Sequence, residues 1–177
     1  MMRSVAFLGG INVGGHRVKM DRLKELFEAA KLKNVTTYIA SGNVLFDHAS
    51  SLDAAKLEAK LEQHLEAALG FPVPTYLRTL QEVAGAVAAN PLELLPDHAL
   101  HVCFLRRALT APETAVLKEY ESDAERLAVH GRQLYWRCAG GASQTKINWR
   151  QLARRINTAS TARNINMLQK LLATSAG

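Results

Sequence analysis

Apolar positions in the first half of the chain follow two spacings. Short β-rich runs, typical of strands, occupy 4–8 and 73–79 and the two halves of 35–46. Between them, apolar residues recur at helical spacing over 20–30, 53–69 and 81–90. The segment SGN at 41–43 favours a tight turn, so 35–46 is predicted to form a hairpin. The predicted order is β-α-β-β-α-β with a trailing helix.

The second half repeats this order after the break NPLELLPDHAL. The pattern predicts a strand, a helix, a hairpin, a helix, a strand and a last helix, at 100–105, 112–125, 126–136, 143–156, 158–163 and 164–172. We therefore expect an α+β fold of two tandem ferredoxin-like plaits, each with a trailing helix, at 1–92 and 93–177. A doubly wound α/β sheet is the alternative, but it requires long parallel crossovers where this chain has tight turns.

The composition is typical of a globular cytoplasmic protein. The chain has 177 residues, of which 48% are hydrophobic and 21% are charged. Its two cysteines, Cys103 and Cys138, lie in apolar runs, which predicts reduced, structural thiols. No signal peptide, membrane-spanning helix or membrane partner is expected from the apolar runs.

The charge is unevenly distributed. From Arg126 onward the chain has nine basic residues and no acidic one, whereas the first 125 residues have 13 basic and 16 acidic residues, a net charge of −3. This asymmetry favours an anionic partner for the strongly basic part from 126 onward. The alternative is that the acidic half folds against the basic half.

The glycine-rich stretch GGINVGGHRVKM at 9–20 joins the first strand to the first helix. Its spacing resembles a phosphate-binding loop, but His16 stands where that loop needs a lysine and Arg17 where it needs a hydroxyl for Mg²⁺. An NTPase function for this loop is therefore rejected. A weaker anion site stays open, built from backbone N–H groups and the donors of Asn12, His16, Arg17 and Lys19. The alternative is that the glycines only permit unusual backbone angles.

A cationic stripe is predicted on the helix at 143–156, because Lys146, Arg150 and Arg154 recur every fourth residue. The stripe is either a phosphate-contacting nucleic-acid surface or a solvated charged face. RNA binding by base stacking is disfavoured, because neither hairpin places two aromatic residues on one face.

The sequence contains no pattern that identifies a reaction. The six histidines and two cysteines show no metal-ligand spacing, and no nucleophile motif or pair of catalytic carboxylates stands out. No metal and no cofactor are therefore expected. Whether the protein is an enzyme, and which residues would be catalytic, is left open.

Three motifs carry a family resemblance: GINVGG followed by a basic residue, TYIASGNVLF, and a late T-x-R-N-x-N run that begins at Thr161. With them the chain resembles the bacterial family known as domain of unknown function 1697. The resemblance implies a small bacterial protein with duplicated plait-like modules, and it brings no reaction or substrate. Gly9 stands where the family usually has arginine, and Ile165 where it usually has tryptophan.

The leading hypothesis is the binding of a small anionic ligand, phosphate- or nucleotide-like, in a pocket shared by the early loop, the hairpin turn and the late motif. The predicted ligand-binding residues are Asn12, Gly14, Gly15, His16, Arg17, Ser41, Asn43, Arg163 and Asn164. The alternative is a nucleic-acid-binding module that uses Lys146, Arg150 and Arg154, and a third reading is a purely structural interaction protein. The oligomeric state is not predicted.

Overall fold

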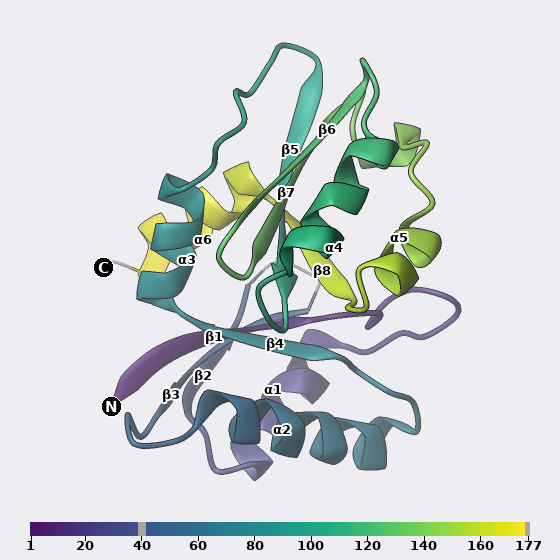
Figure 1. The fold of residues 1–177 in the computed structure, drawn as a ribbon. Helices are drawn as coiled ribbons and strands as arrows, with labels where there is room; N and C mark the ends of the chain where they lie inside the picture. The colour runs from purple at the N-terminus through teal and green to yellow at the C-terminus, as the bar shows by residue number, and fades with distance from the viewer. Residues whose placement is uncertain (39–41, 176–177) are drawn as a thin grey trace. The chain divides into compact units, whose positions relative to one another are not determined.

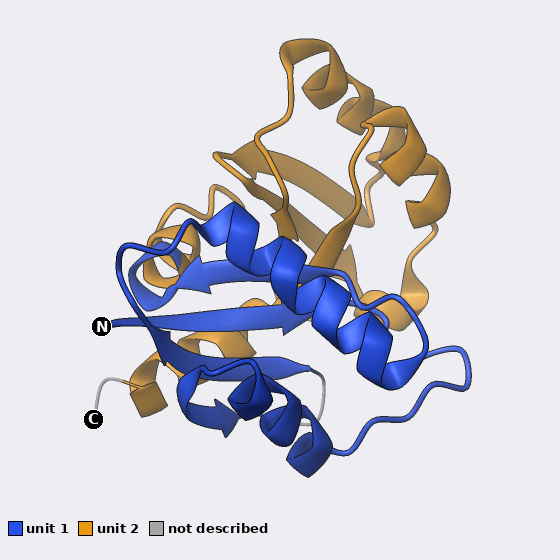
Figure 2. Ribbon diagram, turned by 90° about the horizontal axis from the view of Figure 1, so that it is seen from below, with its two compact units in different colours: residues 1–82 blue, residues 83–177 orange. Residues whose placement is uncertain are grey.

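The computed structural model describes residues 1–38 and 42–175. By its internal contacts the chain forms two compact units, Met1–Glu82 and Val83–Gly177, coloured blue and orange in Figure 2. The boundary between the two units falls inside the trailing helix of the predicted first module. The module limits predicted from the sequence, 1–92 and 93–177, remain a prediction.

The first unit is an antiparallel sheet with two helices on one face (Figure 1). The strands lie in the order β2-β3-β1-β4, so β1 is central and pairs with both β3 and β4. Its elements are β1 (Met2–Leu8), α1 (Met20–Ala29), β2 (Lys33–Thr37), β3 (Asn43–His48), α2 (Ala54–Leu69) and β4 (Thr75–Thr79).

Local sequence signals fix the position of α2. The Asp53 carboxylate accepts a hydrogen bond from the Lys56 N–H at 3.0 Å, as expected of an N-cap. The helix ends at Gly70, whose φ of 83° suits a residue without a Cβ atom. Between these ends, Leu61 and Leu65 are fully buried in the core under the sheet.

The α2 helix also protects the outer edge of the first sheet. β4 is an edge strand, and exposed edge N–H groups invite unwanted pairing. Glu58 accepts a hydrogen bond from the Leu77 N–H, and Glu62 accepts one from the Thr75 N–H, each at 2.8 Å. Two carboxylates of one helix thus bind outward N–H groups of the neighbouring strand.

The second unit repeats this arrangement, with strand order β6-β7-β5-β8. α3 crosses the contact boundary, and its Ala86 carbonyl accepts a hydrogen bond from the Tyr135 hydroxyl at 2.6 Å. The elements are α3 (Leu80–Ala88), β5 (His98–Leu105), α4 (Ala111–Val116), the 3₁₀ turn η1 (Leu117–Tyr120), β6 (Glu125–His130), β7 (Gln133–Ala139), η2 (Ala142–Gln144), α5 (Trp149–Arg155), β8 (Ser160–Asn164) and α6 (Ile165–Ser175).

Strand register shows which residues correspond in the two units. Val5 of β1 lies opposite Arg78 of β4, and Val102 of β5 lies opposite Arg163 of β8. Both arginines are nearly buried, with exposed fractions of 1% and 8%. By the same register, Leu77 corresponds to Ala162 and Thr75 to Ser160.

The predicted α+β class and the repeated element order are confirmed, but two predicted helices are wrong in extent. The helix expected at 112–125 ends at Tyr120 and the chain enters β6 at Glu125. The helix expected at 143–156 is reduced to Trp149–Arg155, with Asn148 as its N-cap. Both differences involve Glu125, which begins β6 and whose side chain is buried. None of the helices in the described residues is long and apolar enough to cross a bilayer.

Candidate functional site

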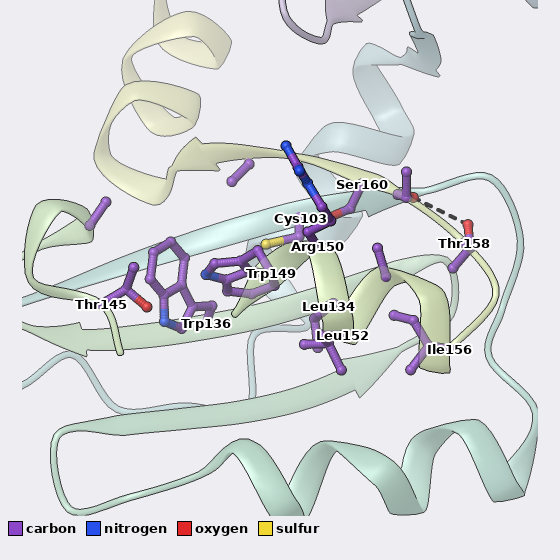
Figure 3. Close-up of a pocket in the computed structure, with 14 residues that line it drawn as sticks. Cys103, Leu134, Trp136, Thr145, Trp149, Arg150, Leu152, Ile156, Thr158 and Ser160 are labelled. Atoms are coloured by element: carbon purple, nitrogen blue, oxygen red, sulfur yellow. Dashed lines mark hydrogen bonds between the residues drawn. The ribbon is translucent and has the colours of Figure 1, made fainter. Parts of the chain in front are cut away.

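A cavity of about 540 Å³ lies within the second unit, beside α5 (Figure 3). Cys103 and Leu134 line it from β5 and β7, Leu152 lines it from α5, and Ser160 and Ala162 line it from β8. Cavities of this volume hold small organic ligands in many proteins. This cavity is therefore the candidate site.

Glu125 holds the segment that leads into α5. Only 2% of it is exposed, and its carboxylate accepts hydrogen bonds from the Thr145 hydroxyl at 2.6 Å, the Lys146 N–H at 2.9 Å and the Trp136 indole N–H at 3.0 Å. Burial alone would raise the pKa of Glu125, but these hydrogen bonds outweigh burial and the pKa lies below its ordinary value. The carboxylate is thus a charged structural acceptor that fixes one side of the cavity.

Aromatic rings form a continuous row on this face of the sheet. His101 stacks on Trp136 with ring centroids 4.8 Å apart, and Trp136 meets Trp149 edge-to-face, also at 4.8 Å. Both tryptophans line the cavity (Figure 3). The Nε1 of Trp149 is buried and has no hydrogen-bond partner within the described part of the chain. A buried donor without an acceptor is costly, so a ligand acceptor at this point would be stabilised.

The outer edge of β8 faces the same space. The Leu105 N–H donates to the Arg132 carbonyl at 3.0 Å, so Leu105 and the alternate residue Cys103 direct their backbone polar groups toward β7. Their partners on β8, Ser160 and Ala162, therefore point their N–H groups away from β5. Neither N–H has another acceptor among the described residues.

The lining of the cavity is mainly apolar and includes one cation, Arg150, and three hydroxyl groups, those of Thr145, Thr158 and Ser160. Arg150 lines it from α5, and none of the described lining residues is an aspartate or a glutamate. Burial raises the pKa of the Cys103 thiol to about 12, so Cys103 stays protonated and is a poor nucleophile. In the described parts of the chain, no group of three or more potential metal ligands lies together. The arrangement suits the binding of an organic anion.

The predicted residues of the glycine-rich loop lie in the first unit, and several bind the loop itself. The Asn12 side chain accepts a hydrogen bond from the Val18 N–H at 3.0 Å, and Arg17 donates to the carbonyls of Asn12 and His16 at 2.9 and 2.8 Å. The His16 ring stacks on Phe71 with centroids 3.8 Å apart. Gly14 and Gly15 are exposed and have φ values of 59° and 89°.

The other predicted ligand-binding residues also contact the backbone. Asn43 is fully buried and its amide donates to the Tyr38 carbonyl at 3.0 Å, which closes the β2–β3 connection. Asn164 accepts a hydrogen bond from the Asn166 N–H at 2.8 Å, at the start of α6. Ser41 lies outside the described residues.

Arg163 is buried, and its guanidinium donates to the Thr161 hydroxyl at 2.8 Å and the Ala162 carbonyl at 2.9 Å. Burial lowers the pKa of Arg163 to about 10. Arg163 and Asn164 belong to the second unit and the loop belongs to the first, so their sharing of one pocket stays a prediction.

The predicted cationic stripe is only partly present. Arg150 and Arg154 are exposed, one turn apart on α5, but Lys146 precedes the helix. The physical reason is that the Lys146 N–H is bound by Glu125 instead of by a helical carbonyl. The prediction that all three cations share one helical face is therefore wrong.

The fold and the cavity define a class of α+β protein with two tandem antiparallel sheets and a candidate ligand site in the second unit. A sequence profile described as "Protein of unknown function (DUF1697)" matches residues 1–135, and the chain belongs to this family. No functionally curated protein matches the chain. The chain is similar to a solved structure, that of the conserved bacterial protein SP0830 from Streptococcus pneumoniae. The TM-score is 0.78 at 24% identity, over 100% of this chain and 99% of the other.

Sequence reasoning missed the residues that shape the cavity. Glu125 was visible as the last acidic residue of the chain, but a single buried acceptor has no spacing that reveals it. Trp149 lies on the apolar side of α5, and its spacing does not distinguish a core residue from one that lines a cavity with a buried Nε1 that has no partner among the described residues. The N–H groups of Ser160 and Ala162 are backbone groups, and only the strand register identifies their direction.

Proposed function

We propose that this protein binds a small organic anion in the cavity beside α5. The ligand has an apolar body, which packs against Trp136, Trp149 and Leu152, and an anionic group, which pairs with Arg150. This keeps the anionic ligand expected from the sequence but places it in the second unit.

One observation carries this proposal: the indole N–H of Trp149 is buried beside a cavity that offers donors and a cation but no carboxylate from the described lining residues. Buried polar groups in native proteins nearly always have a partner. An acceptor supplied by a ligand satisfies this donor, and the charge of Arg150 selects a negative ligand over a neutral one.

Intrinsic fluorescence tests the proposal directly, because the only two tryptophans of the chain both line the cavity. We expect a concentration-dependent change in emission on titration with phenylacetate, 4-methylpentanoate or phenyl phosphate, accompanied by a higher melting temperature. Arg150→Gln should weaken binding about fivefold or more, since it removes a charge-assisted contact. Arg154→Gln is the matched control, because Arg154 is on the same helix but does not line the cavity.

The outcome that rejects the proposal is the absence of any emission change or thermal shift with all three probes at millimolar concentration. Equal weakening in the Arg150→Gln and Arg154→Gln variants would also reject it, because the effect would then come from the overall charge.

A second candidate is the binding of an inorganic or nucleotide phosphate at the Gly9–Lys19 loop. It is favoured by the exposed side chains of His16, Arg17 and Lys19, and by the start of α1, where the N-cap residue Lys19 makes no side-chain cap hydrogen bond to the described residues. Titration with inorganic phosphate and ATP tests it, with Lys19→Gln as the variant and Lys24→Gln as a control further along α1. A thermal shift that Lys19→Gln leaves unchanged would exclude the loop.

A further inference from the structure

We propose that the anionic group held in this cavity is a carboxylate, and that an outward N–H group of β8, that of Ser160 or of Ala162, binds it. The ligand is then a small carboxylic acid with an apolar or aromatic body. This inference rests on the proposed function, since it names the chemistry that the same cavity recognises.

The first unit contains the same kind of contact within the protein itself. On β4, the outward N–H groups of Thr75 and Leu77 each bind a carboxylate, those of Glu62 and Glu58, at 2.8 Å. Thr75 is completely buried and Leu77 is 4% exposed, so water does not replace these acceptors easily. In the first unit, carboxylates therefore satisfy the outer edge of the fourth strand.

The strand register shows which residues of β4 and β8 correspond. Thr75 lies opposite Leu8 of the central strand, as Ser160 lies opposite Leu105. In both units the paired residue of the central strand donates its N–H away from the fourth strand. The Leu8 N–H donates to the Gly42 carbonyl at 2.8 Å, and the Leu105 N–H donates to the Arg132 carbonyl at 3.0 Å. Ser160 and Ala162 therefore direct their N–H groups as Thr75 and Leu77 do.

At this edge, no carboxylate comes from the described residues that line the cavity. No aspartate or glutamate follows Glu125 in the sequence, so α5, β8 and the segment that joins them contain none. The helix is also shorter, with 7 residues in α5 against 16 in α2. In addition, Ala162 takes the place of the larger Leu77, which leaves space beside the strand.

The spacing of the two N–H groups limits the ligand. Alternate residues of a strand are about 7 Å apart, too far for the two oxygens of one carboxylate to bridge. One N–H therefore binds the carboxylate and the other binds a second acceptor of the ligand or a water molecule. Arg150 neutralises the charge, and the apolar body lies against Leu134 and Trp136.

The test compares phenylacetate with its neutral isostere phenylacetamide on the full chain. We expect phenylacetate to bind at least ~10-fold more tightly by tryptophan fluorescence, because hydrogen bonds to a charged group are the stronger ones. In ¹⁵N-labelled protein, the amide proton of Ser160 or Ala162 should move downfield with phenylacetate and not with phenylacetamide. This measurement needs no variant and is unaffected by any loss of folding.

Proline substitutions give an independent check, since proline lacks the N–H and is tolerated on edge strands where that group points outward. We expect Ser160→Pro or Ala162→Pro to reduce the preference for phenylacetate to the part that Arg150 provides, and the matched control Ser160→Ala, which keeps the N–H, to retain the full preference. If neither amide proton moves while phenylacetate still binds more tightly than phenylacetamide, the carboxylate inference is overturned while the proposed function stands. If the two probes bind equally, the selection of an anion by Arg150 fails as well. If neither probe binds, the proposed function itself fails.

Discussion

At the scale of single residues, Glu125 is the side chain on which the shape of the site depends most. Its three hydrogen bonds come from β7 and from the segment before α5. Glu125→Gln should lower the free energy of unfolding by about 3 kcal/mol, because an amide cannot accept all three donors. Urea unfolding followed by circular dichroism measures the change, and Glu93→Gln at an exposed position is the control.

The same residue gives a pH dependence with a defined sign. The pKa of Glu125 is lowered in the folded protein, so its contribution to stability is present above the pKa of an unfolded glutamate, about 4.3. That contribution is lost as the pH falls through the lower, folded value. The stability difference between wild type and Glu125→Gln should therefore shrink between pH 6 and pH 3. A difference that stays constant over this range would contradict the assignment.

Residue types alone could not separate ligand-binding from structural roles. Asn12, Asn43 and Asn164 were predicted as ligand-binding from their motifs, and the structure shows each side chain bound to a backbone group nearby. Asparagine is favoured at turns and caps for the same chemistry that makes it useful for ligands. The sequence motifs therefore identified positions where a side chain binds a nearby group, but not whether that group belongs to the backbone or to a ligand.

At the scale of elements, the edge of β4 depends on two carboxylates of α2. Glu62→Ala should lower the free energy of unfolding by about 1–2 kcal/mol, because the Thr75 N–H is buried and loses its acceptor. Glu62→Gln, which retains an oxygen acceptor, should recover part of this loss. Glu66→Ala, at an exposed position one turn later, is the control for helix propensity. Equal stability of Glu62→Ala and Glu66→Ala in urea would argue against edge protection by α2.

Elements with strong local signals were predictable, and elements determined by distant contacts were not. α2 has an N-cap aspartate, a regular leucine stripe and a terminal glycine, and its predicted range agrees with the structure. The stretch before α5 has helical periodicity too, but Thr145 and Lys146 bind Glu125, which lies about twenty residues earlier in the chain. Periodicity contains no information on such a contact, so the predicted helix was too long.

At the scale of the whole molecule, the net charge of +6 overstates the cationic surface available in the acid-free part of the chain. Arg163 is buried there, and Arg155 binds Glu119 at 2.6 Å. Arg150 and Arg154 remain exposed on α5. The charge asymmetry therefore supports nucleic-acid binding less than the sequence suggested, although that reading remains open to a direct test.

We expect DNA and RNA to bind only at low salt and with a shallow salt dependence. Each phosphate neutralised adds a slope of about −0.9 to log K against log [salt], so phosphate contacts by Arg150, Arg154 and the nearby Lys146 give a slope of about −2 to −3. A gel-shift series from about 20 to 200 mM salt measures the slope, and the double variant Arg150→Gln, Arg154→Gln should reduce it by nearly 2. Binding of DNA or RNA that persists at 200 mM salt, with a slope steeper than about −6, would instead indicate a surface adapted to nucleic-acid binding. That result would favour nucleic-acid binding over the binding of a small ligand in the cavity. The two functions can thus be separated on one protein, because the cavity probes report through tryptophan emission and the nucleic acid reports through its salt dependence.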